Sequence, residues 1–184
     1  MIRFASLFLL SVMLVPGATA QAQAVAHDSA LSSVGAAALH DSVASVSRSQ
    51  LGTRYRLGAA QPGRRFDCSG LVQYVMSVFH VLLPRTAAAQ AQLGVAVPRD
   101  ATQLLPGDIL TFGRGRRITH VGIYVGDGRY IHASSRRRTV VEVPLPDPDT
   151  RQGRLWKGAR RVLNASARAD TDSVPRPIVE SPAS

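Results

Sequence analysis

The sequence predicts a single α+β domain in which N-terminal helices pack on an antiparallel β-sheet. Apolar residues recur at helical spacing up to about residue 93, and β-rich runs follow from residue 109 onward. Helices first and strands afterwards are typical of α+β domains. The chain has 184 residues, of which 45% are hydrophobic, and this length suits one domain with extensions rather than two full domains.

The N-terminus predicts a secretory signal peptide over residues 1–20. A short basic start, Met1-Ile2-Arg3, precedes the apolar run Phe4–Val15, and Pro16-Gly17 ends that run. Ala18-Thr19-Ala20 then supplies small residues at the spacing of a signal-peptidase site. The run is too short for a permanent bilayer-spanning helix. A buried N-terminal helix is the alternative interpretation.

The remaining chain divides into three parts. We expect a linker over residues 21–39, which can become helical, a folded domain over 40–163 and a disordered tail over 164–184. The tail holds mostly Ala, Ser, Asp and Pro, and buries too little apolar surface to offset its ordering entropy. No cysteine follows the apolar run, so we expect an exported protein without a lipid anchor, in the periplasm or outside the cell.

The first helix of the domain is expected to begin at Asp41 as its N-cap and to run to about Leu51. Val43, Val46 and Leu51 would share its buried side. Gly52 is expected to end it.

The second helix has the strongest apolar stripe in the chain. Asp67 is its expected N-cap, and the stripe consists of Cys68, Leu71, Val72, Val75, Met76 and Phe79. A third, short helix is expected over Thr86–Leu93, ending at Gly94.

Five β-rich runs are expected to form the sheet. They are Ile109–Phe112, His120–Val125, Arg129–Ser134, Thr139–Val143 and Gly158–Leu163. A turn, Pro106-Gly107-Asp108, precedes the first of them.

The hairpin around Gly126-Asp127-Gly128 decides where two histidines point. A two-residue loop, Asp127-Gly128, would pair Gly126 with Arg129 and place His120 and His132 on opposite faces. A three-residue loop would pair Val125 with Arg129, place Gly122 opposite His132, and bring both imidazoles to one face. We expect the three-residue loop, because Gly128 suits its left-handed closing position.

The single cysteine, Cys68, lies in the first turn of the second helix, where free N–H groups and the helix dipole favour a thiolate. Adjacent Asp67 opposes this, so a base must share in the activation. A neutral His120 near the sulfur could accept its proton while His132 orients the ring. A small buried core residue is the alternative role for Cys68. Export favours a functional thiol, since a free thiol is a liability in an oxidising compartment.

A known family motif surrounds this cysteine. The segment Phe66-Asp67-Cys68-Ser69-Gly70-Leu71-Val72 resembles the nucleophile motif of the NlpC-type cell-wall cysteine peptidases, a papain-like family. Further blocks resemble the same family in the same order, namely Leu51–Tyr55 with Gly58, Leu83–Thr86 with Gln90, Leu105–Phe112, Thr119–Tyr124, Ile131–Ser134 and Ala159–Val162. The chain departs from the pattern at Ala59, where a second glycine is usual. The resemblance spans residues 42–163 and implies a papain-like fold.

The resemblance implies a catalytic set of Cys68 as nucleophile, His120 as base and His132 as the orienting residue. Cleavage would pass through an acyl-enzyme, with the backbone N–H of Cys68 as one oxyanion donor.

Three more positions have implied binding roles. The hydroxyl of Tyr55 would lie beside the reacting carbonyl. Asp67 and Ser69 match positions that hold the free amine of the substrate in some members, and helix capping alone is their alternative role.

The implied substrate is the peptide stem of peptidoglycan, hydrolysed without a cofactor. The cut bond is either the D-glutamyl–diamino acid bond or the D-amino-acid cross-link between stems, and the sequence does not decide between them. A catalytically silent wall-binding module of the same fold is the alternative function. A zinc site of Cys68, His120 and His132 is the alternative chemistry, but no clear fourth group accompanies it and we expect no metal.

The basic excess bears on location rather than on the reaction. The net charge is +10, and Lys157 is the only lysine among 22 basic residues. No nucleic-acid-binding motif accompanies the arginines, and we expect no nucleic-acid partner. Clustered arginines in predicted loops can contact an anionic wall or lipid surface weakly, or they reflect only a biased surface composition. The oligomeric state is left open.

Overall fold

The computed structural model describes residues 34–145 and 156–163. The predicted signal peptide, the start of the predicted linker and the predicted tail lie outside these residues. Helices occupy 34–48, α2 (Cys68–Val78) and α3 (Ala87–Gln90), and one 3-10 turn, η1, spans Ala101–Gln103. None of the helices in the described ranges is long and apolar enough to cross a membrane.

The strands form one curled sheet. They are β1 (Arg54–Tyr55), β2 (Ala60–Gln61), β3 (Arg65–Phe66), β4 (Val95–Val97), β5 (Ile109–Arg114), β6 (Arg117–Gly126), β7 (Arg129–Ser134), β8 (Thr139–Pro144) and β9 (Trp156–Arg161). Their order in the sheet is β2-β3-β1-β8-β7-β6-β5-β9-β4. Among the described strands, all neighbours pair antiparallel except β1 and β3, which run parallel. The expected antiparallel sheet is therefore mixed near one edge.

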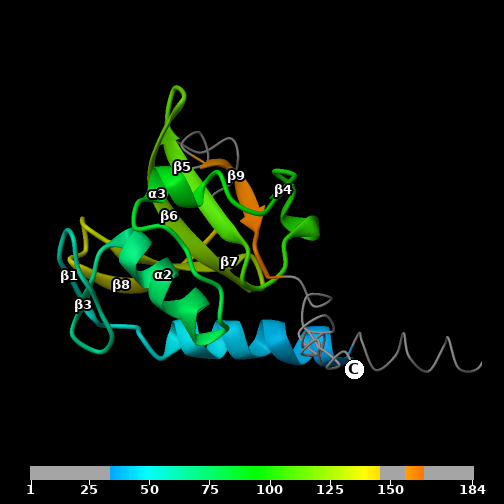
Figure 1. Ribbon diagram of the computed structural model, residues 1–184, viewed down its shortest axis with the longest axis horizontal. Helices are drawn as coiled ribbons and strands as arrows, with labels where there is room; N and C mark the ends of the chain where they lie inside the picture. Colours follow the sequence, from blue (N-terminus) through cyan, green and yellow to red (C-terminus); the bar gives the residue numbers. More distant parts are fainter. Residues whose placement is uncertain (1–33, 146–155, 164–184) are drawn as a thin grey trace, which may run out of the picture.

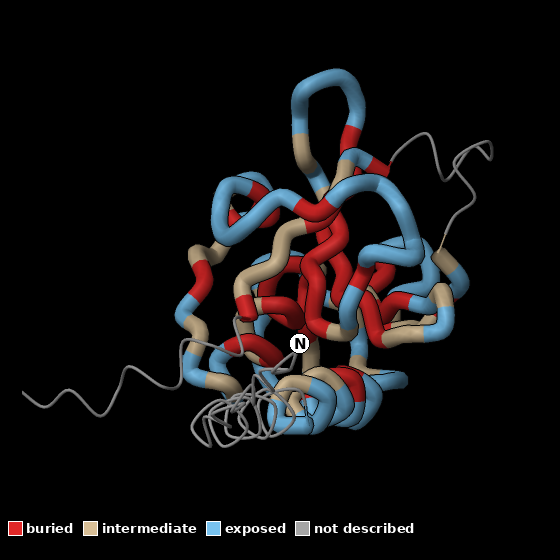
Figure 2. The backbone as a smooth tube through the Cα atoms, turned by 90° about the vertical axis from the view of Figure 1, so that its right-hand side faces the viewer, coloured by how far each residue is buried: buried red, intermediate tan, exposed pale blue. Residues whose placement is uncertain are grey.

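Two apolar clusters lie on opposite faces of the central strands, because side chains alternate along β5, β6 and β7. The larger cluster joins Val43 of the first helix and the buried side of α2 to Ile109, Val121 and Ile131. The smaller cluster gathers the large side chains of the other face, namely Leu110, Phe112, Tyr124, Tyr130 and Trp156. Figure 1 shows α2 against the sheet and the first helix along the lower edge, and Figure 2 shows buried residues concentrated between them. This arrangement confirms the predicted α+β class.

The first helix differs from its prediction at both ends. It is already helical at residue 34, so Asp41 lies inside it and is not its N-cap. Three consecutive alanines, 36–38, favour helix strongly enough to extend it across the end of the predicted linker. Leu51 follows the helix in a turn and is 42% exposed, whereas Val43 is fully buried as expected.

The second helix begins where the sequence predicts, with Asp67 as its N-cap. The third is shorter than the predicted Thr86–Leu93, since Thr86 is its N-cap and regular helix ends at Gln90. The strands of residues 109–143 match their predicted runs to within three residues at either end.

The histidine hairpin has a different loop from the expected one but the expected register. Gly126 pairs with Arg129, so the loop is the two-residue Asp127-Gly128, and both residues have positive φ. A bulge between Tyr124 and Gly126 then shifts the register by one residue, and Ile123 pairs with Ile131. The bulge thereby restores the pairing that a three-residue loop would have given.

Candidate active site

The start of α2 carries the cysteine. Asp67 has extended backbone and its Oδ1 accepts a hydrogen bond from the N–H of Gly70 at 2.7 Å, which fixes the first turn of the helix. A side chain at Gly70 is not accommodated, because a Cβ there would lie 2.2 Å from the carbonyl oxygen of Ala59. The loop before β2 therefore packs directly on the turn that holds Cys68.

The thiol of Cys68 is half-buried and unbridged. Burial raises its pKa, and the negative charge of Asp67 adds to this rise. The backbone N–H groups of Val121, Ser69 and Cys68 itself act in the opposite direction by favouring the thiolate. The contact with Val121 places the sulfur at β6, one residue along the chain from His120.

The two histidines meet on one face of the sheet, as predicted. His120 Nε2 and His132 Nδ1 are 2.7 Å apart, and their rings are nearly perpendicular at 88°. Gly122 leaves room for this arrangement, since a Cβ there would lie 2.9 Å from the Tyr130 ring and 3.2 Å from the Cβ of His132. The hydrogen bond to His132 occupies Nε2 of His120, so Nδ1 is the remaining nitrogen.

Burial keeps both imidazoles neutral at ordinary pH. It lowers the pKa of His120 to about 4. It also lowers the pKa of His132 to about 3, with smaller contributions from His120 and from the charge of Arg137. The rings of Phe112 and Tyr130 supply much of this apolar cover, with centroids 5.9 Å from His120 and 5.3 Å from His132.

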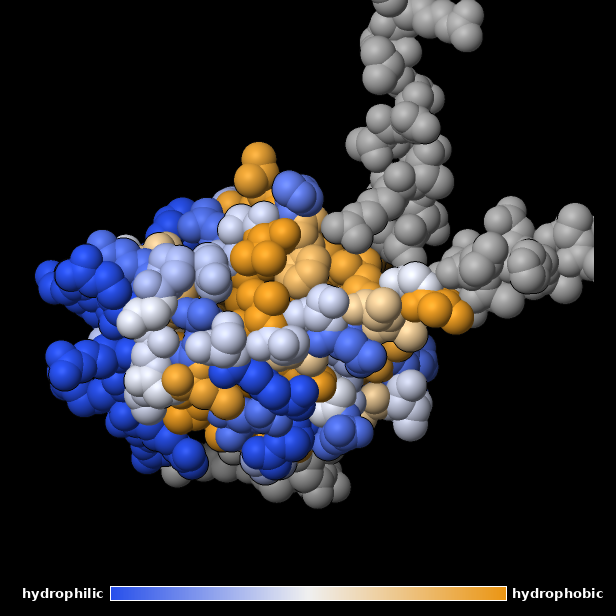
Figure 3. All heavy atoms as spheres, turned by 90° about the horizontal axis from the view of Figure 1, so that it is seen from below, coloured by the Kyte–Doolittle hydropathy of each residue, from blue (hydrophilic) through white to orange (hydrophobic). Residues whose placement is uncertain are grey.

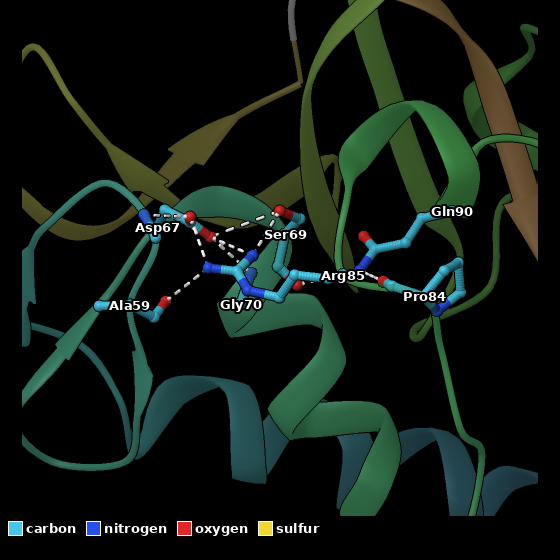
Figure 4. A network of polar contacts seen from close by, with 8 residues as sticks. Ala59, Asp67, Ser69, Gly70, Pro84, Arg85 and Gln90 are labelled. Carbon is cyan, nitrogen blue, oxygen red and sulfur yellow. Dashed lines mark hydrogen bonds and ion pairs between the residues drawn. The ribbon is translucent and has the colours of Figure 1, made fainter.

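An arginine that the sequence analysis gave no role joins Asp67 to Ser69 (Figure 4). Arg85 donates to Asp67 Oδ1 at 2.9 Å, to Asp67 Oδ2 at 2.7 Å and to the Ser69 hydroxyl at 3.0 Å. The N–H of Gly58 also donates to Asp67 Oδ2 at 2.7 Å. Burial works against the ionised carboxylate, but these hydrogen bonds, with that from Gly70, hold the pKa of Asp67 below its usual value. The only available signal for Arg85 was the block Leu83–Thr86.

Gln90 supports the same turn from α3. Its side-chain amide donates to the carbonyl of Ser69 at 3.0 Å and to that of Pro84 at 2.9 Å (Figure 4). The side chain is fully buried, and its carbonyl oxygen has no hydrogen-bond partner among the described residues.

Tyr55 lies in β1 beside the cysteine. Its backbone N–H donates to the carbonyl of Arg138 at 2.8 Å, which ties β1 to the turn between β7 and β8. Burial raises the pKa of the Tyr55 phenol. A thiolate at Cys68 would raise this pKa further, and the negative charge of Asp67 adds to the rise.

The predicted residues thus fall into two groups. Tyr55, Asp67, Cys68 and Ser69 lie together around the start of α2, and His120 and His132 form a pair on the sheet. Among the described residues no hydrogen bond joins the thiol to an imidazole. The part of the chain that the structure describes holds no group of three or more His, Cys, Asp or Glu side chains arranged to bind a metal.

Comparisons with known proteins agree with this architecture. A family model described as NlpC/P60 family matches residues 52–158. Murein DD-endopeptidase MepH of Escherichia coli is 39% identical over 118 residues, which cover 62% of this chain and 42% of that protein. Gamma-DL-glutamyl hydrolase of Bacillus subtilis is 33% identical over 140 residues, covering 72% of this chain and 32% of that one. The chain therefore spans less than half the length of either relative.

A solved structure of a NlpC/P60 family protein from Bacillus cereus has a TM-score of 0.61 and 30% identity, and the match covers 68% of this chain and 40% of that one. The fold is the papain-like α+β fold that the sequence predicts.

Proposed function

Because the chain belongs to the NlpC/P60 family, we propose that it is an exported cysteine peptidase that hydrolyses peptide bonds in the stems of peptidoglycan. The observation that carries the proposal is the imidazole pair. His132 holds Nε2 of His120 at 2.7 Å, so Nδ1 of a neutral His120 is available as a base. A relative named a murein DD-endopeptidase supports the substrate class.

Cys68 is the proposed nucleophile. Its thiol is protonated at rest, because burial raises its pKa. His120 Nδ1 accepts the proton as Sγ attacks the scissile carbonyl, and the backbone N–H of Cys68 stabilises the developing oxyanion. His120 then returns the proton to the leaving amine, and a water hydrolyses the thioester. His132 is a positioning residue that fixes the ring of His120.

The residues around the cysteine take supporting roles in this proposal. The oxygens of Asp67 already accept from Gly58, Gly70 and twice from Arg85, which leaves little capacity for a substrate amine. This geometry supports helix capping as the main role of Asp67. Ser69 is also buried, and its hydroxyl donates to Asp67 Oδ1 at 3.4 Å and accepts from Arg85 at 3.0 Å. The phenol of Tyr55 is therefore the better placed group for substrate contact.

Digestion of purified peptidoglycan tests the proposal. The wild type should release soluble stem fragments, and Cys68→Ala should reduce release by about 1,000-fold or more because the nucleophile is lost. The masses of the fragments identify the bond that is cut. Undiminished release by Cys68→Ala would contradict the cysteine mechanism, and absence of release by the folded wild type, with retained binding to sacculi, would favour the silent wall-binding module.

Two controls complete this experiment. A thiol alkylator should abolish release and a metal chelator should leave it unchanged, whereas the reverse result would support the zinc alternative.

Export is tested separately by fractionating cells that express the full chain or a chain lacking residues 1–20. The full chain should leave the cytoplasm and the shortened chain should remain there.

A further inference from the structure

An open cavity of about 560 Å³ lies beside β1 and β3, near one end of the sheet, and Tyr55 is one of its lining residues. The residues that line it come from the segments Gly52–Arg56 and Gly63–Arg65, and four of them are arginines, namely Arg54, Arg56, Arg64 and Arg65. Three of these four side chains are exposed and Arg65 is half-buried. A hollow with so many guanidinium groups is suited to anions rather than to apolar ligands.

The turn between β7 and β8 adds three more arginines to this edge. Arg136, Arg137 and Arg138 are all exposed. The turn is joined to the cavity wall, because the carbonyl of Arg138 accepts from the N–H of Tyr55 and Thr139 pairs with Arg54. We call these seven arginines the basic edge. It lies at the end of the domain that carries β1, β3 and β8, and Figure 3 shows that end as strongly hydrophilic.

The charge of the basic edge is not neutralised by the described part of the protein. Arg48, Arg85, Arg129 and Arg161, which lie elsewhere, each pair with a carboxylate. Within residues 34–145 and 156–163 none of the seven arginines of the basic edge forms an ion pair, and Arg65 bonds only to the amide of Gln61. The nearby acid, Asp67, is already committed to Arg85.

The basic edge borders the candidate active site on two sides. On one side, Tyr55 lines the cavity and packs against the same apolar cluster as Cys68. On the other side, the backbone N–H of Arg137 donates to the hydroxyl of Ser134 at 3.1 Å, two residues beyond His132 in β7. A substrate peptide with its scissile carbonyl at Cys68 would therefore lie close to the basic edge, and its anionic groups could reach the arginines there.

We propose that the basic edge is a subsite for the free carboxylates of the stem peptide, and that it makes the enzyme discriminate against stems whose carboxylates are amidated. The ligand class rests on the proposed function. Guanidinium groups bind carboxylates through paired, charge-assisted hydrogen bonds that a neutral amide cannot replace. The discrimination is expected to weaken as salt screens the exposed arginines.

The test compares one synthetic stem peptide in two forms, with free carboxylates and with the same groups amidated. Wild-type kcat/KM should be about 10-fold higher for the free acid, which is the size expected for charge-assisted hydrogen bonds at an exposed site. The double variant Arg54→Gln/Arg56→Gln should reduce that ratio to about twofold, mainly by lowering kcat/KM for the free acid. Raising the salt concentration from 20 mM to 300 mM should reduce the wild-type ratio in the same direction.

A matched control removes two charges elsewhere. Arg114 and Arg116 lie at the turn between β5 and β6, away from the cavity, and both are exposed. Arg114→Gln/Arg116→Gln should keep the wild-type ratio, and all three proteins should show the same thermal unfolding midpoint. A wild-type ratio near one, or an equal loss in both double variants, would overturn the subsite.

Failure of the subsite is distinguishable from failure of the proposed function. Cleavage of both peptides at equal rates overturns the subsite alone. If the wild type cleaves neither peptide, the proposed peptidase function is overturned. The affinities of both peptides for Cys68→Ala then test the subsite on its own. Tighter binding of the free acid supports the subsite without the reaction, and equal binding overturns both.

Discussion

Two aspartate–arginine pairs with buried carboxylates have similar local geometry in different parts of this domain. Asp67 accepts from Arg85 through both oxygens and caps α2, which begins with Cys68. Asp108 accepts from Arg161 at 2.8 and 2.7 Å, and its Oδ2 also accepts from the N–H of Leu105. The first pair holds the turn that carries the thiol, and the second joins β9 to the start of β5.

The difference between the pairs lies in what surrounds them. The Asp108 side chain is 1% exposed and Arg161 is 28% exposed, against 7% and 38% for Asp67 and Arg85. The Asp108–Arg161 pair, which joins β9 to the start of β5, is therefore the less exposed of the two, and no predicted site residue contacts it. The pair near the thiol also contacts Ser69 and lies next to the basic edge. Similar chemistry thus anchors a strand in one place and the first turn of α2, with the Cys68 thiol, in the other.

Among variants that test this comparison, the largest effect is expected from Asp67→Asn set beside Asp108→Asn. Asp67→Asn should lower kcat/KM by about 100-fold, because Arg85 loses its charged partner and the turn that carries the thiol then shifts relative to the substrate carbonyl. Asp108→Asn should lower the free energy of unfolding by about 3 kcal/mol, because Arg161 loses its charged partner in an enclosed site. Kinetics on synthetic stem peptides and urea unfolding measure the two effects.

Equal losses of kcat/KM in both variants, after correcting each activity for the fraction of folded protein, would contradict the proposed difference between the two pairs. Arg161→Met in the Asp108→Asn background is a further control. Removing the second charge should recover part of the lost stability and leave kcat/KM unchanged.

A smaller effect is expected from a methyl group added beside the imidazole pair. Gly122→Ala adds a Cβ that crowds Tyr130 and His132, so it should displace the ring of His132 and lower kcat by about 10-fold. Asp67 and Arg85 are untouched, so the variant isolates the sheet side of the site from the helix side. Gly35→Ala serves as control, because a Cβ at Gly35 has no neighbour within 4 Å. Equal activity of both variants would show that the pair tolerates displacement.

The smallest effect is expected from acid. The proposed base, His120, must be neutral to accept a proton, and burial lowers its pKa to about 4. Lowering the pH from 7 to 5 should therefore change kcat/KM by less than about twofold, whereas an ordinary imidazole with a pKa near 6.5 would lose about 30-fold. A pH–rate profile on a soluble peptide measures this. A fall centred near pH 6.5 would show that the imidazole is more hydrated than its burial implies.

Acid should also act on stability through the same group. The pKa of His120 is about 6.5 in the unfolded chain and about 4 in the folded one, so the unfolded chain binds more protons between these values. The free energy of unfolding should therefore fall as the pH drops from about 6.5 toward 4. Asp67 acts in the same direction at lower pH. Its pKa is lower in the folded chain than in the unfolded one, so protonation of its carboxylate also lowers the free energy of unfolding.

The elements with long apolar patterns were predictable from the sequence. The stripe from Cys68 to Phe79 and the β-rich runs after residue 109 each bury a regular face, and periodicity reports this directly. The two-residue strands β1, β2 and β3 were not predicted, because pairing partners rather than their own residues define them. The first helix began earlier than predicted because alanines carry no apolar pattern and still favour helix.

The site was predictable in its members and less so in its connections. Cys68, His120 and His132 stand out by residue type and motif, and their catalytic roles stay predictions. The role of Arg85 as the partner of Asp67 depends on the loop before α3 returning to α2, which no local pattern encodes. The role of Gln90 was equally hard to predict, because its buried amide donates to the carbonyls of residues 69 and 84, which only the fold brings next to it.

The bulge between Tyr124 and Gly126 has a consequence for alignment of related sequences. It absorbs one residue of the strand without turning the imidazoles to opposite faces. A relative that lacks this residue and has a regular ladder would present the same two side chains on the same face of the sheet. The separation of twelve positions between His120 and His132 is then not an invariant. A gap placed at Val125 would be the structurally correct one, even where shifting it elsewhere in the hairpin gives a higher score.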